Sequence, residues 1–403
     1  MRFGVNYIPS KNWLHNWIDF DERAVREDLE AIRSIGLDHI RAHLIWPYFQ
    51  VNPTKMSDAT MKNLERFTRL CEEVGLDFCL SLFTGWMSGF HFYPSFMKAH
   101  RSFAMFSGES EREYEKFYIR QIASVVAQSP NFLGFDLGNE LSCVTPLDKN
   151  TTIQGNDAWQ DDMFAVCEEC APGKLHNNGV DHKPWFFERD FSRSGLANTG
   201  ALTPLHCWTF FTGASQRGGL LSTASLHIGE YMAELAKAYS NDPARKIWIQ
   251  EFGCSKHWIE AESESIEAFL EGSFQALCET DGMWGLTWWC SHDLPDELSG
   301  YDKIEYDLGL LDVNNQPKPA AKVLARLIAQ YKQNPIQPVQ RSEAMVYQPA
   351  KEHTAEESWA FAEKFMAAIE QGKRPAIVLP ERANDMDYLS SRGIKHILRE
   401  EEV

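Results

Sequence analysis

Two glutamates each follow a short apolar run, at the point where a strand of a parallel sheet would end. Glu140 closes the run that begins at Phe132, and Glu251 closes the run that begins at Ile247. Cleavage of a glycosidic bond uses two carboxyl groups. One is protonated to help the leaving oxygen depart, and the other is ionised to attack or stabilise the positive sugar carbon. The two positions therefore predict a glycoside-cleaving site.

The elements that would position these glutamates alternate along the chain. Short apolar runs predict eight strands, separated by longer segments of helical periodicity. The predicted strands are residues 3–6, 39–44, 77–83, 133–137, 174–178, 202–206, 247–250 and 285–289. Repeats of about 35 to 45 residues are typical of an α/β fold of the (β/α)8 TIM barrel type. A doubly wound open sheet is the alternative, but no Gly-rich dinucleotide fingerprint follows the first strand.

A smaller unit follows the predicted barrel. Pro335 and Pro338 end the last helical pattern and begin an extended linker. Beyond it, strand-like residues 344–347, 376–379 and 396–398 alternate with helical residues 356–371 and 384–392. We predict a catalytic barrel over residues 1–332 and a linker with a small C-terminal α/β appendage over residues 333–403. The appendage is too short for a roomy core, so we expect it to pack on the barrel or on another subunit of a homo-oligomer.

Composition and charge exclude several classes of partner. Lys and Arg total 39 against 57 Asp and Glu, and the net charge of −18 repels nucleic acid and anionic membrane surfaces. No apolar run reaches the ~18 residues that cross a membrane, and the first residues read as a core strand without a secretory signal. Nine scattered cysteines suit reduced thiols. We therefore expect a cytoplasmic protein.

The tightest cysteine spacing is Cys167 and Cys170, with His176 shortly after. A zinc site would need a second pair of ligands at matching spacing, and the sequence has none. We therefore interpret these cysteines as thiols on a helix. No metal and no organic cofactor is predicted.

In a β/α barrel, chemistry is expected at the carboxyl ends of the strands. Besides the glutamates, the polar and aromatic residues at these ends are Arg41, His43, Asn139, His206, Trp288, Trp289, His292 and Asp293. Glu140 and Glu251 are three β/α units apart, so they would face one sugar ring from opposite sides of the opening. At a separation of ~5 Å they would act with retention, one forming a glycosyl-enzyme intermediate and the other serving first as acid and then as base.

Each of these residues also has a purely structural interpretation. A glutamate after a strand can cap the next helix or pair with an arginine, and Arg41 can belong to a structural ion pair. The same guanidinium, beside the attacking carboxylate, would keep that carboxylate ionised. His206 can be a buried histidine bonded to backbone. Trp288 or Trp289 could stack on a sugar face, and the strand pleat would turn one of the two inward.

Two longer segments offer walls for a pocket. Residues 84–101 are rich in aromatic side chains, including Trp86, and predict a structured loop over one end of the barrel. The insert at residues 182–199 could close the other side, with Trp208, Trp258 and His292 as further wall residues. Polymers such as mannan do not enter a cytoplasm, so we expect exo action on a small oligosaccharide.

Several of these motifs together resemble glycoside hydrolase clan A, and family 5 in particular. They are the Leu-Gly-Asn139-Glu140 run, the Gln-Glu251-Phe-Gly run, Arg41, His206 and the Trp288-Trp289 pair. The resemblance covers the predicted barrel. It implies that Glu140 is the acid/base, that Asn139 binds the sugar 2-hydroxyl and that Glu251 is the nucleophile.

A narrower resemblance rests on the opening Phe-Gly-Val-Asn-Tyr-Ile-Pro, on Ile45-Trp-Pro-Tyr48, on Phe210-Phe-Thr-Gly213 and on Trp288-Trp-Cys-Ser-His292-Asp293. These runs are similar to a bacterial family 5 branch of intracellular exo-β-mannosidases. The resemblance implies release of mannose from β-1,4-mannosyl-N-acetylglucosamine, a unit of N-glycan cores. Trp86 departs from it, because a polar residue is expected there. A β-glucosidase, an endo-β-mannanase and a non-catalytic carbohydrate-binding barrel stay open as alternatives.

Overall fold

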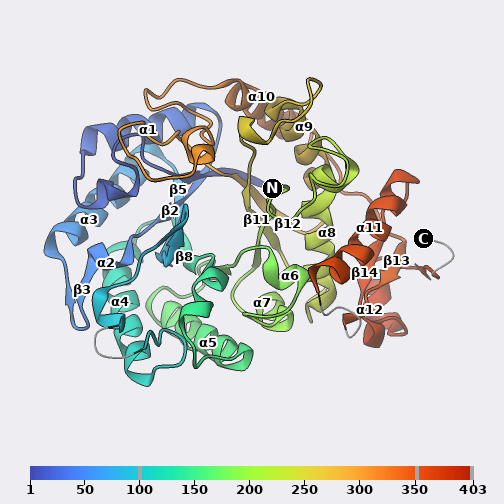
Figure 1. Ribbon diagram of the computed structural model, residues 1–403, viewed down its shortest axis with the longest axis horizontal. Helices are drawn as coiled ribbons and strands as arrows, with labels where there is room; N and C mark the ends of the chain where they lie inside the picture. The colour runs from blue at the N-terminus through green and yellow to red at the C-terminus, as the bar shows by residue number, and fades with distance from the viewer. Residues whose placement is uncertain (99–101, 350–353, 400–403) are drawn as a thin grey trace.

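Eight parallel strands form the centre of the molecule (Figure 1). They are β1 (Arg2–Tyr7), β2 (His39–His43), β5 (Asp77–Phe83), β8 (Phe132–Asn139), β9 (Asn177–Gly179), β10 (Thr203–His206), β11 (Ile247–Phe252) and β12 (Met283–Trp288). They pair in the order β10-β11-β12-β1-β2-β5-β8-β9, and β9 lies beside β10, so the sheet curls into a nearly closed barrel. The predicted TIM barrel is confirmed in this computed structural model, which describes residues 1–98, 102–349 and 354–399.

Helices surround the barrel. They are α1 (Glu22–Ser34), α3 (Asp58–Val74), α4 (Glu109–Val126), α5 (Ile153–Cys170), α7 (Arg193–Asn198), α8 (Thr223–Tyr239), α9 (Ile266–Cys278) and α10 (Pro319–Gln333). Several begin at a side chain that accepts a backbone N–H of the first turn, as Asp21, Ser57 and Ser222 do. None of the described helices is long and apolar enough to cross a membrane.

Two segments differ in detail from the sequence expectation. The strand predicted at residues 174–178 begins only at Asn177, because the chain first turns where His176 N–H donates to the Lys174 carbonyl at 2.9 Å. The aromatic segment after β5 contains a hairpin of β6 (Trp86–Met87) and β7 (Phe90–His91). Its last predicted residues, 99–101, lie outside the described part of the chain.

A small parallel sheet follows the barrel. Its strands are β13 (Glu343–Val346), β14 (Ala376–Val378) and β15 (His396–Ile397), in the order β14-β13-β15, with helices α11 (Ala355–Glu370) and α12 (Met386–Ser391). We call this part the C-terminal unit. Its own core has few members: Ala344, Ala376, Val378, Tyr388, Leu389 and Ile394. Other apolar residues of the unit, among them Met345 and Trp359, belong to the main core of the molecule.

The C-terminal unit packs against α8, as Figure 1 shows at the right of the barrel. Buried Glu230 of α8 pairs with Arg341 at 2.7 Å and with Arg374 at 2.8 Å, and buried Glu234 pairs with Arg392 at 2.7 Å. Buried charges are tolerated only when they are paired. The expectation that this unit packs on the barrel is therefore met.

Candidate active site

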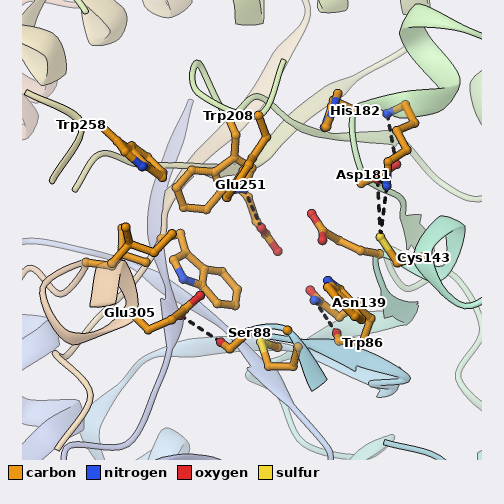
Figure 2. A pocket seen from close by; sticks show the side chains of 18 residues that line it. Trp86, Ser88, Asn139, Cys143, Asp181, His182, Trp208, Glu251, Trp258 and Glu305 are labelled. Carbon is orange, nitrogen blue, oxygen red and sulfur yellow. Dashed lines mark hydrogen bonds and ion pairs between the residues drawn. The ribbon is translucent and has the colours of Figure 1, made fainter. Parts of the chain in front are cut away.

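A cavity of about 380 Å³ opens at the carboxyl ends of the barrel strands (Figure 2). Its size falls in the range of small-molecule sites. Aromatic and polar side chains share the lining, chiefly Trp86, Ser88, Asn139, Glu140, Cys143, Asp181, His182, Lys183, Trp208, Phe211, Glu251, Trp258, Trp289 and Glu305. The cavity therefore combines apolar surface with several carboxyl groups.

Glu251 lies near the end of β11, where the pairing register shifts against both neighbouring strands. Such irregularities re-aim side chains next to active sites. The Oε1 atom of Glu251 accepts a hydrogen bond from Arg41 Nη1 at 2.7 Å, and its Oε2 atom accepts one from Trp208 Nε1 at 3.1 Å. Burial raises the pKa of Glu251, and the Arg41 charge and the Trp208 N–H oppose that rise by stabilising the carboxylate.

Arg41 is fully buried beneath the cavity. Its guanidinium donates two bonds to Asp136, at 2.8 and 2.7 Å, and one to Asn139 Oδ1 at 2.9 Å, in addition to the bond to Glu251. Asn139 in turn donates from Nδ2 to the Trp86 carbonyl at 2.9 Å. Both interpretations of Arg41 hold at once, because the buried ion pair with Asp136 aims the cation at Glu251.

Glu140 follows β8 with a φ of +48°, a conformation that side-chain-bearing residues rarely adopt. Its N–H donates to the Gly179 carbonyl at 2.8 Å, which stabilises this conformation. Gly179 also lies close to the Gln250 side chain. A Cβ atom at position 179 would lie 2.4 Å from Gln250 Oε1, so only glycine fits there. Burial, with the Asp181 charge, raises the pKa of Glu140 to about 8. Glu140 is therefore protonated at neutral pH.

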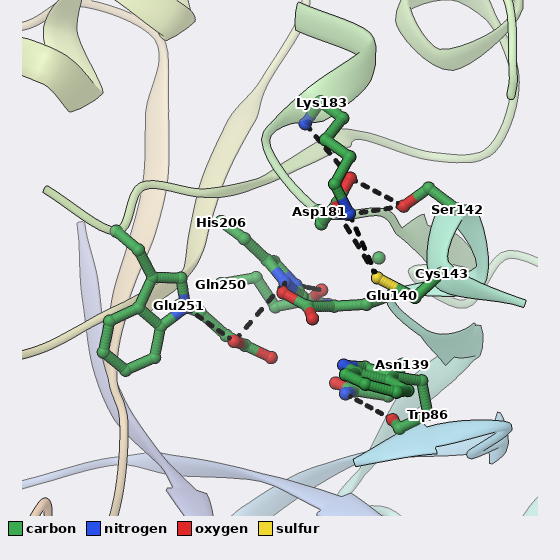
Figure 3. A network of polar contacts seen from close by, with 12 residues as sticks. Trp86, Asn139, Glu140, Ser142, Cys143, Asp181, Lys183, His206, Gln250 and Glu251 are labelled. Atoms are coloured by element: carbon green, nitrogen blue, oxygen red, sulfur yellow. Dashed lines mark hydrogen bonds and ion pairs between the residues drawn. The ribbon is translucent and has the colours of Figure 1, made fainter. Parts of the chain in front are cut away.

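His206 connects the two carboxyl groups (Figure 3). Its Nδ1 atom lies 3.0 Å from Glu140 Oε1 and 3.4 Å from Glu251 Oε2, and its Nε2 atom lies 3.1 Å from Gln250 Oε1. Burial lowers the pKa of His206, so the ring is neutral and carries a single proton.

The position of that proton follows from a chain of hydrogen bonds that begins at a backbone carbonyl. The Leu175 carbonyl can only accept, and Asn177 Nδ2 donates to it at 3.0 Å. Asn177 Oδ1 therefore accepts from Gln250 Nε2, at 2.8 Å. Gln250 is thereby left with Oε1 facing His206, so the proton lies on His206 Nε2 and Nδ1 is an acceptor. A protonated Glu140 is the partner that this acceptor requires.

The spacing of the two carboxyl groups suits one sugar ring. One polar atom from each of Glu140, His206 and Glu251 lies within 4.8 Å of the other two. Retaining glycosidases place their carboxyl groups ~5–5.5 Å apart. The same three residues have the spacing of a metal site, but Arg41 already supplies a cation at 2.7 Å from Glu251, and a protonated Glu140 is a poor ligand. The donor set therefore fits acid/base chemistry better than a metal ion.

An ion pair lies beside Glu140 (Figure 3). Asp181 Oδ2 and Lys183 Nζ are 2.6 Å apart, and Ser142 Oγ donates to Asp181 Oδ1 at 2.7 Å. Although burial opposes ionisation of Asp181, the neighbouring His182 and Lys183 lower its pKa. A permanent negative charge therefore lies next to Glu140, which explains part of the raised pKa of that residue.

A third carboxyl group lies across the cavity from Asp181 (Figure 2). Glu305 follows β12 on a short 3-10 helix, and it accepts a hydrogen bond from Ser88 Oγ at 2.9 Å. Burial raises the pKa of Glu305 to about 7. This carboxyl group changes its charge near neutral pH.

The structure places the sequence-predicted residues in four groups, and three of these lie in or against the cavity. Trp86, Asn139, Trp208, Trp258 and Trp289 line the cavity together with both glutamates. Arg41 and His206 lie beneath it and contact the carboxyl groups. His43 is fully buried and packs on Trp289, with ring centroids 5.5 Å apart, so it supports the cavity floor and does not line it.

Three predicted residues are corrected, because they point away from the cavity. Trp288 packs on Phe252 in the core, and its indole N–H points to the Leu308 carbonyl. His292 lies at hydrogen-bond distance from the Ile8 carbonyl and Asn315, and it is not a wall residue. Asp293 accepts from Lys318 at 2.7 Å. The chain leaves the barrel mouth after Trp289, so these polar groups are satisfied by the segment that follows it and, for His292, also by the Ile8 carbonyl.

Sequence reasoning missed Ser88, Cys143, Asp181, Lys183 and Glu305. Ser88 and Lys183 lie in the two segments that were expected to form walls of the pocket, so the sequence did indicate the segments in which they would be found. Asp181 lies two residues after the end of β9, a strand whose predicted bounds stopped short of it. Glu305 lies far along the loop after the last strand, where no periodic pattern marks it.

Solved structures match this chain over its whole length. A GH5_18 protein from Streptomyces cattleya in complex with GlcNAc is 34% identical, with a TM-score of 0.94, and the match covers 100% of this chain and 98% of that one. A glutamate-to-alanine variant of GH5_18 from the same organism, in complex with Manβ1-4GlcNAc, is 34% identical with a TM-score of 0.92, covering 98% of each chain.

A third similar structure is a glutamate-to-alanine variant of GH5_18 from Bifidobacterium longum subsp. longum, also in complex with Manβ1-4GlcNAc. It is 29% identical with a TM-score of 0.90, and the match covers 99% of this chain and 95% of that one. A comparison with family models gives no match, and a comparison with curated protein sequences gives none either.

Proposed function

This chain belongs to glycoside hydrolase family 5, subfamily 18, and we propose that it is a retaining exo-β-mannosidase. Its substrate in this proposal is a short β-1,4-mannoside such as mannosyl-β-1,4-N-acetylglucosamine. The observation that carries the proposal is that one carboxyl oxygen of Glu140 lies within 4.8 Å of one carboxyl oxygen of Glu251 in a single cavity. The Manβ1-4GlcNAc disaccharide bound by two similar proteins supports the choice of substrate.

In the first step, Glu251 attacks the anomeric carbon while Glu140 gives its proton to the departing oxygen. The bond from carbon to the leaving oxygen breaks as the bond to Glu251 forms. Arg41 and Trp208 keep Glu251 ionised before attack, at 2.7 and 3.1 Å. The Trp208 indole cannot ionise, so it serves this role at any pH in the working range.

In the second step, Glu140 removes a proton from water, and the hydroxide oxygen displaces Glu251 from the sugar. Glu140 is negative only in this intermediate. In this intermediate, burial and the Asp181 charge destabilise the Glu140 carboxylate. This favours its taking a proton from water. The neutral His206 accepts from Glu140 in the resting enzyme and so keeps the proton in place.

The mannose ring is proposed to lie on the Trp289 side of the cavity, between Glu251 and Asn139. Asn139 Oδ1 accepts from Arg41 and keeps a second lone pair for the sugar 2-hydroxyl. Trp289 and Trp86 offer aromatic faces for the apolar face of the ring. Glu305 and Ser88 lie on the far side from Asp181, where they would meet hydroxyls at the non-reducing end.

The direct test is hydrolysis of Manβ1-4GlcNAc, compared with aryl β-mannoside, β-glucoside and β-galactoside. We expect mannoside to be the best aryl substrate and NMR to detect β-mannose as the first product. A poorer rate on mannoside than on glucoside would favour a β-glucosidase. Internal cleavage of mannan would favour an endo-β-mannanase, and binding without turnover would favour a non-catalytic barrel.

We also propose a cellular location, a domain division and an oligomeric state for this chain. A cytoplasmic location is supported by nine free cysteines, all of them within the described residues. A division into residues 1–332 and 333–403 is supported by the separate small sheet. A homo-oligomer would be detected by light scattering of the full chain.

A further inference from the structure

One helix of the C-terminal unit, α11, contacts two loops that line the cavity. The first loop, residues 181–187, carries Asp181, His182 and Lys183, and the second, residues 208–217, carries Trp208 and Phe211. Both loops follow strands of the barrel, whereas α11 lies outside it (Figure 1). The C-terminal unit therefore reaches the active site indirectly.

The first loop is bound to α11 at Phe186. Ser358 Oγ donates to the Phe186 carbonyl, and the Trp359 ring stacks on the Phe186 ring with centroids 5.3 Å apart and an angle of 30°. Trp185 is fully buried, so this end of the loop is fixed on two sides. Phe186 follows Lys183 within a single short helix, α6 (Lys183–Phe186).

The second loop is bound to α11 at Thr212. Trp359 Nε1 donates to the Thr212 carbonyl at 2.8 Å, in a buried contact. Thr212 donates to the Trp208 carbonyl from N at 3.0 Å and from Oγ1 at 2.8 Å, and Trp208 Nε1 donates to Glu251. A short series of hydrogen bonds thus connects Trp359 with the nucleophile.

An arginine completes the contact. The guanidinium of Arg217 lies 3.9 Å above the Trp359 ring, and it donates to the Gly213 carbonyl at 2.9 Å and to Glu363 of α11 at 2.8 Å. Trp359 is therefore enclosed between Phe186 of one loop and Arg217 of the other. Cation–π stacking over a largely buried ring adds to the stability of this arrangement.

The first of these loops, residues 181–187, lies on the side of the cavity where the leaving sugar departs, whereas the second loop brings Trp208 to the nucleophile. Glu140 gives its proton to the leaving oxygen, so the wall beside Glu140 faces that sugar. Asp181 and Lys183 are next to Glu140 in Figure 3, whereas Glu305 and Ser88 are on the opposite side in Figure 2. Phe211 is half exposed at the mouth of the cavity on the same loop as Trp208.

We propose that Trp359 is a positioning residue for the active site, and that the C-terminal unit sets the affinity for the leaving sugar without touching it. The inference rests on the proposed function. Loops that are ordered before binding lose less entropy when a ligand binds. Trp359 satisfies a loop carbonyl and packs between the two loops, so it supplies this order from outside the barrel.

The test uses Trp359→Phe, which removes the N–H donor and keeps a ring for Phe186 and Arg217. The probes are GlcNAc, for the leaving side, and mannose, for the other side, as inhibitors of aryl β-mannoside hydrolysis. We expect the Ki of GlcNAc to rise about three- to tenfold, the size of one lost buried hydrogen bond, while the Ki of mannose stays within about twofold. For Manβ1-4GlcNAc, KM should rise more than kcat falls.

The matched control is Phe365→Leu. Phe365 is fully buried on the same helix, but it packs on Tyr231 of α8 with centroids 5.5 Å apart. This variant should lose stability in a thermal melt without changing the ratio of the two Ki values. If both variants change that ratio equally, or if Trp359→Phe raises both Ki values together, the positioning role is overturned.

Arg217→Met keeps the inference testable if Trp359→Phe does not fold, because the Arg217 side chain is 27% exposed and tolerates change. It should raise the Ki of GlcNAc alone, by a smaller factor than Trp359→Phe. An unchanged Ki overturns the proposal. Failure of the function itself would look different, because the native enzyme would then release no mannose from Manβ1-4GlcNAc.

Discussion

His206 Nδ1 lies 3.0 Å from Glu140 Oε1, and the hydrogen bonds behind the ring make that nitrogen an acceptor. The resting enzyme therefore holds Glu140 as the acid, ready for the first step. A neutral histidine also avoids a second cation next to Arg41, which would compete for Glu251. This relationship gives the active site a defined protonation state that can be tested by pH.

The first prediction concerns the basic side of the pH profile. Glu140 must be protonated to act, so kcat/KM should fall as pH rises through its pKa of about 8. Asp181→Asn removes a negative charge beside Glu140 and should lower that pKa, which moves the basic limb to lower pH by roughly one unit. The profile of kcat/KM against pH measures the shift. An unchanged basic limb would show that Asp181 does not act on Glu140.

The second prediction assigns the nucleophile. Glu251→Ala should abolish turnover of Manβ1-4GlcNAc, because among the described residues that line the cavity no other carboxylate is paired with Arg41. Added azide should restore cleavage of an activated aryl β-mannoside and give the α-mannosyl azide, with the configuration inverted. NMR of the azide product is the measurement. Rescue that gave the β-azide instead would assign the nucleophile elsewhere.

The third prediction assigns the acid. Glu140→Ala should slow poor leaving groups by a factor of about 10³ and activated aryl groups much less, since a good leaving group needs little protonation. A plot of log kcat/KM against the pKa of the leaving phenol should become steeper than in the native enzyme. Equal losses for all leaving groups would indicate a binding role for Glu140.

Much of the site could be predicted because it lies where local patterns are strongest. Glu140 and Glu251 end apolar runs, and the barrel brings strand ends together at one face. Asn139 and His206 also lie at the carboxyl ends of strands. The full-length similarity to GH5_18 structures confirms the family 5 resemblance read from these motifs.

The rest of the site depends on structural features that cannot be read from the sequence. The register shifts around β11 decide which side chains face inward, and they are visible only in the paired strands. The pleat turns Trp289 to the cavity and Trp288 to the core, and the sequence left that choice open. Asp181 and Glu305 enter through loops whose course is set by tertiary packing.

The last prediction concerns Glu305. Its pKa of about 7 means that the carboxyl group is neutral at pH 5 and ionised at pH 8. An ionised carboxylate accepts stronger hydrogen bonds from sugar hydroxyls, so mannose should bind the native enzyme more tightly as pH rises through 7. Glu305→Gln keeps the shape without the charge, and its Ki for mannose should not follow pH. We expect it to bind mannose about tenfold more weakly than the native enzyme at pH 8 and nearly equally at pH 5. The Ki of GlcNAc should be the same in both proteins, because Glu305 lies across the cavity from the leaving side. A GlcNAc effect as large as the mannose effect would place Glu305 at the leaving sugar instead.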